Sequence, residues 1–135
     1  MELSSEEKTL GGLAHVAAIF GWIGVIANVI LFVLYREKSK YVAGHSKQAL
    51  GLSVISVVVS WVLGLFGAGS AGLLSIGSMG AAVGAALIIG LVSLAWGIVV
   101  LVLAIMAAMK GFKGEEHRYP LFGKAVNDIG GDKAA

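Results

Sequence analysis

The sequence contains no cysteine, which excludes disulfides, thiolate metal sites and cysteine nucleophiles. Charged residues are also scarce, at 13 %, whereas a soluble domain usually carries about 25 %. No aspartate, glutamate, lysine or arginine occurs in residues 48–109, a run of 62 residues. A water-exposed globule cannot cover its surface with so few charges, so the composition predicts a membrane-embedded chain.

Length and net charge narrow the class further. The 135 residues suit one compact unit, and we expect a single membrane domain over residues 1–135. A net charge of +2 gives no electrostatic basis for binding nucleic acid. The expected location is the inner (cytoplasmic) membrane, in which the chain would be a multi-pass protein.

Three apolar segments are long enough to cross a bilayer. Residues 10–35 carry no charge and would form a helix of ~39 Å, against ~30 Å for the hydrocarbon core. We place two further spans at 48–66 and 85–109. Residues 67–84 hold six glycines, which weaken helices in water, and are expected to connect them. The expected fold is an all-α, polytopic membrane helical bundle with three transmembrane helices.

A second arrangement of the N-terminal segment remains open. Trp22 lies in the middle of residues 10–35 beside Gly21, whereas tryptophan prefers membrane interfaces. It either packs against neighbouring helices within one span or marks a break in the helix. A break would give a re-entrant or broken helix hairpin followed by two spans, because each half is too short to cross alone.

Basic residues predict the orientation of the chain. They concentrate in a polar hinge, residues 36–47, and in a tail, residues 110–135. With three spans, hinge and tail lie on one side, and the positive-inside rule makes that side cytoplasmic and places the N-terminus outside. Lys47 can extend to the interface, and the basic hinge is expected to attract anionic lipid headgroups.

Within the spans, the candidate interaction residues are small or uncharged. Ser56, Ser60 and Gly64 repeat every four residues, a pattern that lets helices approach closely. The row favours packing within the chain or, alternatively, a homo-oligomer or another membrane protein partner. Asn28 is expected to form an interhelical hydrogen bond. No ionisable acid or base lies within a span, which argues against an ion-coupled transporter.

Polar residues at the mouth of the second span predict a cytoplasmic polar cap. His45 and Gln48 lie three residues apart and share a helix face, so they could reach the tail. The tail residues concerned are Arg118, Tyr119 and Pro120, and Pro120 biases Tyr119 away from helix.

The chain has three histidines, whose expected role is hydrogen bonding near the headgroups. In the three-span arrangement His15 lies across the membrane from His45 and His117, whereas the hairpin brings all three to one side. No H-x-x-x-H pattern or carboxylate spacing indicates a metal, so we expect no metal and no cofactor. No nucleophile–base pair is present, and we expect no enzymatic activity.

Three short motifs carry a resemblance to known proteins: "LAHVAA" at 13–18, "GHSKQAL" at 44–50 and "RYPL" at 118–121. In this order they resemble the DUF4870 family, which is similar to Tic20-like small integral membrane proteins. The resemblance implies three or four membrane helices. Among related proteins, some belong to the chloroplast protein import machinery and others are found in magnetosome membranes.

Two functions follow as hypotheses. The first is a non-enzymatic integral membrane protein that acts through helix packing and its polar cap, as a scaffold or as an accessory to protein translocation or membrane organisation. The alternative is an oligomeric pore or carrier for a small solute, formed around the glycine- and serine-rich helix faces.

Overall fold

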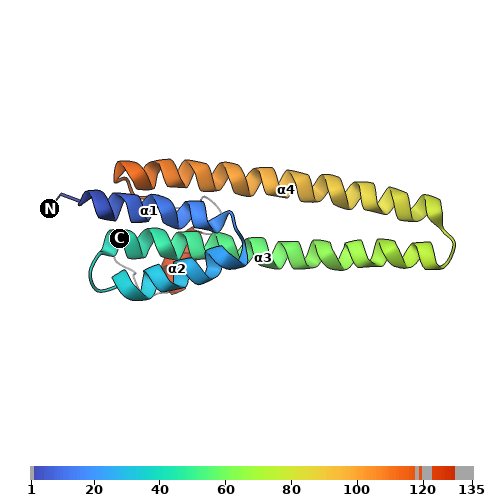
Figure 1. The fold of residues 1–135 in the computed structure, drawn as a ribbon, viewed down its shortest axis with the longest axis horizontal. Coiled ribbons are helices and arrows are strands. Elements are labelled where there is room, and N and C mark those ends of the chain that lie inside the picture. The colour runs from blue at the N-terminus through green and yellow to red at the C-terminus, as the bar shows by residue number, and fades with distance from the viewer. Residues whose placement is uncertain (1, 118, 120–122, 130–135) are drawn as a thin grey trace.

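The computed structural model describes residues 2–117, 119 and 123–129. Helices account for all of its regular structure in these ranges: α1 (Ser5–Ala18), α2 (Trp22–Tyr35), α3 (Lys40–Ser75), α4 (Met79–Lys113) and α5 (Gly123–Ile129). The long helices α3 and α4 form one antiparallel hairpin, and α1 and α2 form a shorter hairpin packed against one half of it (Figure 1). The all-α class is therefore confirmed for the described residues.

The continuous first helix expected over residues 10–35 is wrong. α1 ends at Ala18 and α2 begins at Trp22, and Gly21 between them has φ 60° and ψ −113°. This conformation is readily adopted only by glycine, because it lacks a Cβ. The chain reverses here, and the Asn28 amide of α2 donates a hydrogen bond to the Ala14 carbonyl of α1 at 3.1 Å. The structure contains the hairpin alternative, and the three expected spans are not confirmed.

Alanine at position 21 is expected to destabilise the protein by ~1–3 kcal/mol, the range for a backbone strained in this way. The matched control is Gly90→Ala in α4, where an added Cβ meets no atom within 4 Å. That control should be neutral or slightly stabilising, because alanine favours helix. Denaturant unfolding in detergent measures both, and equal stabilities of the two variants would contradict the role of Gly21.

The connector expected over residues 67–84 is also wrong in its extent. α3 continues to Ser75 and α4 begins at Met79, so the turn is confined to residues 76–78, with Gly77 at φ 78°. The remaining glycines of this stretch are helical. Glycine weakens helices in water, but in lipid no solvent competes for the backbone groups, so the helical hydrogen bonds persist.

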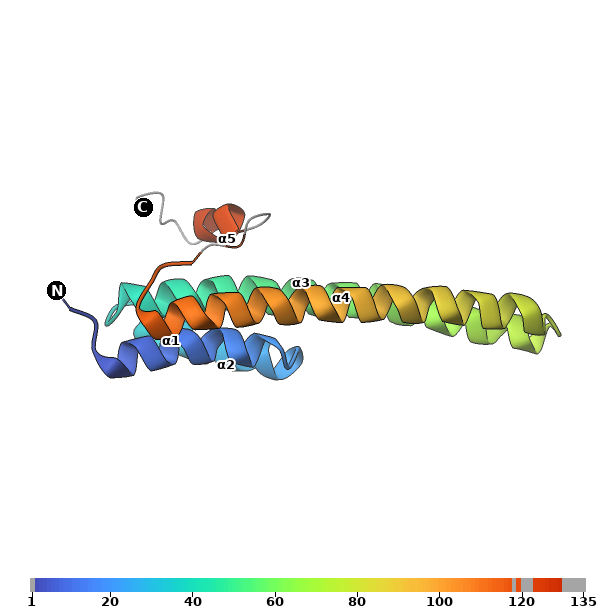
Figure 2. The same cartoon turned by 90° about the horizontal axis from the view of Figure 1, so that it is seen from above.

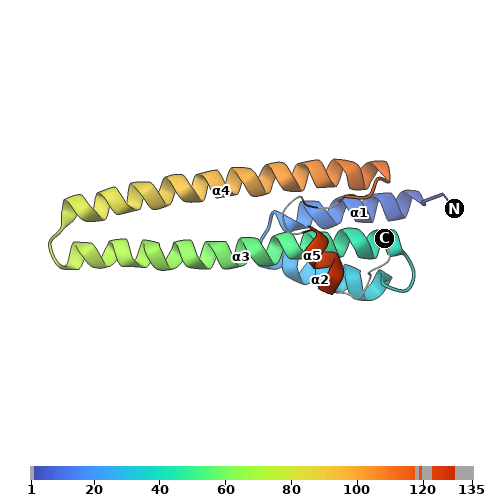
Figure 3. The same cartoon turned by 180° about the vertical axis from the view of Figure 1, so that it is seen from behind.

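Polar residues gather at one end of the molecule. The start of α1, the hinge between α2 and α3, and the end of α4 lie together there (Figure 3). We call residues 2–8, 36–48, 110–117 and 119 the polar cap. The buried core packs against the cap: Tyr119 of the cap contacts a cluster that includes Ala14, Ala18, Leu52 and Ala104.

The other half of the α3–α4 hairpin extends beyond the short hairpin. Its large apolar side chains face outward: Leu65, Ile76 and Leu91 are 69 %, 75 % and 68 % exposed. Both α3 and α4 are long and apolar enough to cross a membrane, whereas α2 is a shorter apolar helix. We call residues 19–23, where α1 turns into α2, the hairpin tip, and residues 62–95 of α3–α4 the distal half. Figure 2 shows the short hairpin and α5 on opposite faces of the α3–α4 pair.

Candidate functional site

Buried histidines and a tyrosine meet where α1 packs against the polar cap. Nδ1 of His15 (α1) lies 2.7 Å from the hydroxyl of Tyr119, and its Nε2 lies 2.9 Å from Nδ1 of His45 (α3). Nε2 of His45 lies 3.0 Å from the backbone carbonyl oxygen of Glu115. His15, His45 and Tyr119 are all buried. This hydrogen-bond chain connects α1, α3 and the segment that follows α4.

The backbone carbonyl of Glu115, the last acceptor, determines the direction of every hydrogen bond in this series. A carbonyl oxygen only accepts, so His45 carries its proton on Nε2 and its Nδ1 accepts. His15 must then donate from Nε2 to His45, which leaves its Nδ1 to accept from the Tyr119 hydroxyl. His15 and His45 are thereby each held in the tautomer protonated on Nε2, and the Tyr119 hydroxyl is the first donor of the series.

Further polar contacts attach the tail to the same helices. The backbone N–H of Tyr119 donates to Oε1 of Gln48 at 3.4 Å, and Gln48 is buried. The Tyr41 hydroxyl donates to the Gly111 carbonyl, and the Tyr41 and His45 ring centroids are 4.5 Å apart. Gln48 and His45 therefore contact the tail from one face of α3.

His117 completes the cluster by ring contacts. Its centroid lies 5.0 Å from that of Tyr119 and 6.0 Å from that of His15, both edge-on. Both ring nitrogens of His117 are buried without a hydrogen-bond partner among the described residues. The three-span expectation that separated His15 from the other histidines is wrong, because α1 starts in the polar cap and α2 returns to it.

The cluster is arranged for hydrogen bonding. Both ring nitrogens of His15 are engaged by Tyr119 and His45. Within the described ranges, no three or more His, Cys, Asp or Glu side chains are arranged to hold a metal ion. The geometry therefore ties the segment after α4 to α1 and α3.

Burial keeps the cluster uncharged at neutral pH. Desolvation, with smaller contributions from His45 and His117, lowers the pKa of His15 to about 2. Desolvation, followed by the charge of Lys110, also lowers the pKa of His117, and desolvation raises the pKa of Tyr119. Neutral rings and a protonated phenol are the states that the directed hydrogen-bond chain requires.

The depressed pKa of His15 predicts lower stability in acid. An unfolded histidine has a pKa of about 6.5, so below that pH the unfolded chain binds a proton that the folded chain excludes. The contribution of His15 to the free energy of unfolding is therefore complete above pH ~7. Protonation of this residue in the unfolded chain should lower the free energy of unfolding by ~2 kcal/mol between pH 7 and pH 5. Unfolding in detergent at the two pH values measures the loss, which should shrink in His15→Gln. An unchanged wild-type stability would contradict a buried neutral His15.

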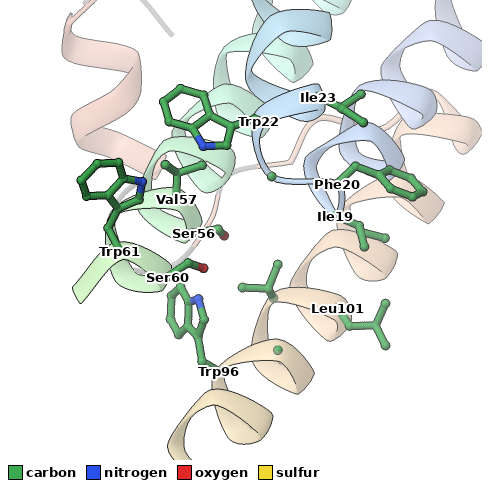
Figure 4. A pocket seen from close by; sticks show the side chains of 13 residues that line it. Ile19, Phe20, Trp22, Ile23, Ser56, Val57, Ser60, Trp61, Trp96 and Leu101 are labelled. Carbon is green, nitrogen blue, oxygen red and sulfur yellow. The ribbon is translucent and has the colours of Figure 1, made fainter. Parts of the chain in front are cut away.

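A hollow lies beneath the hairpin tip, on the side away from the polar cap. Its volume is about 740 Å³, and all three tryptophans of the chain line it: Trp22, Trp61 and Trp96. Figure 4 shows the Trp96 indole pointing toward Ser60. The indole nitrogen of Trp96 is buried without a hydrogen-bond partner among the described residues. The hollow marks the level in α3 and α4 at which the short hairpin ends.

The remaining predicted residues lie in different surroundings. Ser56 and Ser60 line the hollow, and the Ser56 hydroxyl donates to the Leu52 carbonyl of its own helix at 2.8 Å. Gly64 is exposed, and an added Cβ there would meet no atom within 4 Å. The row they form therefore does not pack on a neighbouring helix at Gly64. Lys47 lies in the polar cap on α3, whereas Arg118 and Pro120 lie outside the described residues.

A family model, that of the magnetosome magnetite crystal formation protein family (MamF/MmsF), matches residues 6–126. The chain belongs to this family. The match covers both hairpins and the histidine cluster, so the MamF/MmsF assignment applies to the whole arrangement described above. Comparison with curated proteins and with solved structures found no match.

The MamF/MmsF match corrects the resemblance drawn from the sequence motifs. The matching family is MamF/MmsF and not DUF4870 or the Tic20-like proteins. Motifs of four to seven residues are too short to separate one family of small membrane proteins from another. The assignment supports a membrane protein of a family that takes part in magnetosome crystal formation.

Sequence reasoning did not find two features of this MamF/MmsF protein. The first is the contact of His15 with His45: the hairpin alternative places both on one side of the membrane, but no sequence pattern indicates that the two rings touch. The second is the hollow with its three tryptophans. The sequence does contain an indication of this hollow. Trp22 and Trp96 both lie in the middle of apolar segments, away from the interfaces that tryptophan prefers.

Proposed function

We propose that this MamF/MmsF protein is a non-enzymatic, multi-pass protein of the cytoplasmic membrane that organises the membrane in magnetosome crystal formation. One observation carries the proposal. Residues 48–109 form a hairpin without a charged residue, while the described charged residues lie in the polar cap and α5. Such segregation suits a chain whose distal half is in lipid and whose cap is in water.

The dimensions of the uncharged hairpin support a full crossing. Residues 48–75 of α3 extend over ~42 Å, and a bilayer with its headgroup regions is ~40–45 Å thick. The turn at residues 76–78 would then emerge on the opposite side from the polar cap. α1 and α2, of 14 residues each, extend over only ~21 Å and would enter the cap-side leaflet without crossing.

The basic residues support a cytoplasmic cap. In this topology the N-terminus, hinge and tail share one side, and that side holds every lysine and arginine of the chain. The N-terminus is therefore proposed to be cytoplasmic, unlike in the three-span arrangement. Arg36, Lys38, Lys40 and Lys47 would attract anionic headgroups there.

The composition of the turn at residues 76–78, which we call the far turn, favours membrane organisation over mineral templating. It presents hydroxyl and backbone groups, from Ser75, Gly77 and Ser78, and the sequence places every carboxylate side chain outside residues 48–109. Carboxylates are the preferred ligands of hard cations. An influence on crystals would therefore act through the membrane and through proteins that contact this chain.

Outward-facing glycines support contact with other membrane helices. Added Cβ atoms at Gly64, Gly84 and Gly90 would meet no atom within 4 Å, so these positions are open to a neighbouring backbone. A second copy of this chain or another membrane protein would fit such a surface.

Single cysteines at Ser5 and Ser75 test the topology in this cysteine-free chain. Both side chains are exposed, one in the polar cap and one before the far turn. In intact cells a membrane-impermeant maleimide should label position 75 and leave position 5 unlabelled. Label at both positions would instead support the three-span arrangement, and label at neither would contradict a crossing.

A transport assay tests the non-transport role. Purified protein in liposomes should give no selective flux of small solutes above that of empty liposomes. Selective flux that is lost in Ser60→Leu, with Ser70→Leu in the distal half as the matched control, would contradict the organising role and favour a pore.

A further inference from the structure

The cross-section of the protein differs between the two halves of the long hairpin. Beside the polar cap, α1 packs against α3 and α4 while α2 packs against α1 and α3, so four helices run side by side (Figure 1). The hairpin tip ends at the level of Ser60 and Gly97, which line the same hollow. Beyond that level α3 and α4 alone continue among the described helices, over 34 residues that include the turn at residues 76–78.

The level at which the short hairpin ends, and four helices give way to two, coincides with the middle of the uncharged hairpin. Residues 48–75 of α3 have their centre near Trp61, and residues 79–109 of α4 have theirs near residue 94, close to Trp96. Trp61 and Trp96 both line the hollow below the tip. In a bilayer crossed by this hairpin, the cap-side leaflet would therefore contain four helices and the other leaflet two.

The exposed side chains of the short hairpin support its placement in lipid. Phe20, Trp22 and Ile23 at the tip are 61 %, 61 % and 67 % exposed. In water these groups would form an exposed apolar surface, whereas in the hydrocarbon region they face lipid chains. The tip thus has the composition of a segment held at depth.

We propose that this protein is a membrane wedge that favours bilayers curved with the polar cap on the convex side. A helix is ~10–12 Å across, so two additional helices occupy ~200 Å² in the cap-side leaflet alone. A leaflet with the larger area lies on the outside of a curved membrane.

The proposal rests on the proposed crossing of α3 and α4, and it specifies how the protein would organise a membrane. With a cytoplasmic cap, the favoured shape is a membrane that bulges into the cytoplasm, such as the wall of an internal vesicle. The protein would enrich in such membranes and orient its cap outward from the vesicle.

Orientation in vesicles of different size tests the wedge. Ser5→Cys and Ser75→Cys proteins are reconstituted into small sonicated and large extruded vesicles of one lipid composition, and outer cysteines are labelled with an impermeant maleimide. The ratio of cap-out to cap-in protein should be higher in the small vesicles, by about threefold if curvature biases the two orientations by about 0.65 kcal/mol. An equal ratio in both sizes would overturn the proposal.

Variants of the tip separate the wedge from other causes of orientation. Phe20→Lys with Ile23→Lys places two charges where each costs about 3 kcal/mol in the hydrocarbon region, and should draw the tip outward and remove the size dependence. Phe20→Leu with Ile23→Leu should retain it. A size dependence that persists with the lysines, while helix content is unchanged, would overturn the wedge.

The two positions also distinguish failure of the wedge from failure of the crossing. If positions 5 and 75 are labelled from the same side of one vesicle, α3 and α4 do not cross, and the proposed function fails with the wedge. If they are labelled from opposite sides with no dependence on vesicle size, the crossing stands and the wedge alone is wrong.

Discussion

Replacing Gly111 with valine is expected to separate α1 from α4 and to destabilise the protein by about 3 kcal/mol. An added Cβ at Gly111 would lie 2.7 Å from the carbonyl carbon of Gly11 and from the amide nitrogen of Gly12. These are backbone atoms, which cannot rotate away as a flexible side chain would. The two helices must therefore move apart, and the contact that holds α1 in the cluster is lost.

Gly97→Val is the matched control for this substitution. Gly97 lies on the same helix, and an added Cβ there meets no atom within 4 Å. Valine at that position should change the free energy of unfolding by less than ~1 kcal/mol. Denaturant unfolding in detergent measures both variants. Equal effects at the two positions would contradict the close approach of α1 and α4.

Replacing His15 with leucine is expected to release the segment after α4 and to destabilise the protein by ~2–4 kcal/mol. The substitution removes the hydrogen bond between His15 and the Tyr119 hydroxyl, worth about 1 kcal/mol, and leaves the buried Nδ1 of His45 unsatisfied, which costs about 1–3 kcal/mol. Because hydrogen bonds then no longer connect α1 to Tyr119, the segment after α4 is less protected. Trypsin should therefore cleave after Lys113 faster than in the wild type.

Tyr119→Phe provides the second arm of a double-mutant cycle. Alone it should destabilise by about 1 kcal/mol, since it removes one hydrogen bond of 2.7 Å while the ring stays in place. In the His15→Leu background it should have a smaller effect, with a coupling of ~1 kcal/mol. Additive effects would show that the directed hydrogen-bond chain does not link the two residues.

Composition and charge pattern were sufficient for the helical class and for the two long helices. The 62-residue run without charge predicted two of them, because lipid is the solvent such a run suits. The face shared by His45 and Gln48 also indicated a contact with the tail. The structure places Gln48 against the Tyr119 backbone and His45 against the Glu115 carbonyl.

The path of residues 10–35 could not be decided from hydropathy alone. One helix and a hairpin expose the same apolar residues to lipid, so the pattern is the same for both. What separates them is the backbone of Gly21 and the return of Asn28 to Ala14, which are tertiary features. The hairpin alternative brings the three histidines to one side, but the contacts of His15 with His45 and Tyr119 follow from how α1 packs on α3 and were not predicted.

The extent of the connector predicted over residues 67–84 was wrong for a different reason. Helix propensities measured in water make six glycines in residues 67–84 a strong breaker. In an apolar solvent the backbone has no alternative partners, and the helices continue to Ser75 and from Met79. Of these six glycines, Gly77 alone, with φ 78°, has the conformation of a turn glycine.

The depth of the three tryptophans tests the central claim most directly, which is that the short hairpin ends near the middle of the bilayer. All three line the hollow at the tip, so the fluorescence of the unmodified protein reports that level. In vesicles with brominated lipids, quenching should be strongest when bromine lies near the ends of the acyl chains. Strongest quenching by bromine near the headgroups would place the tip at the interface and contradict the account.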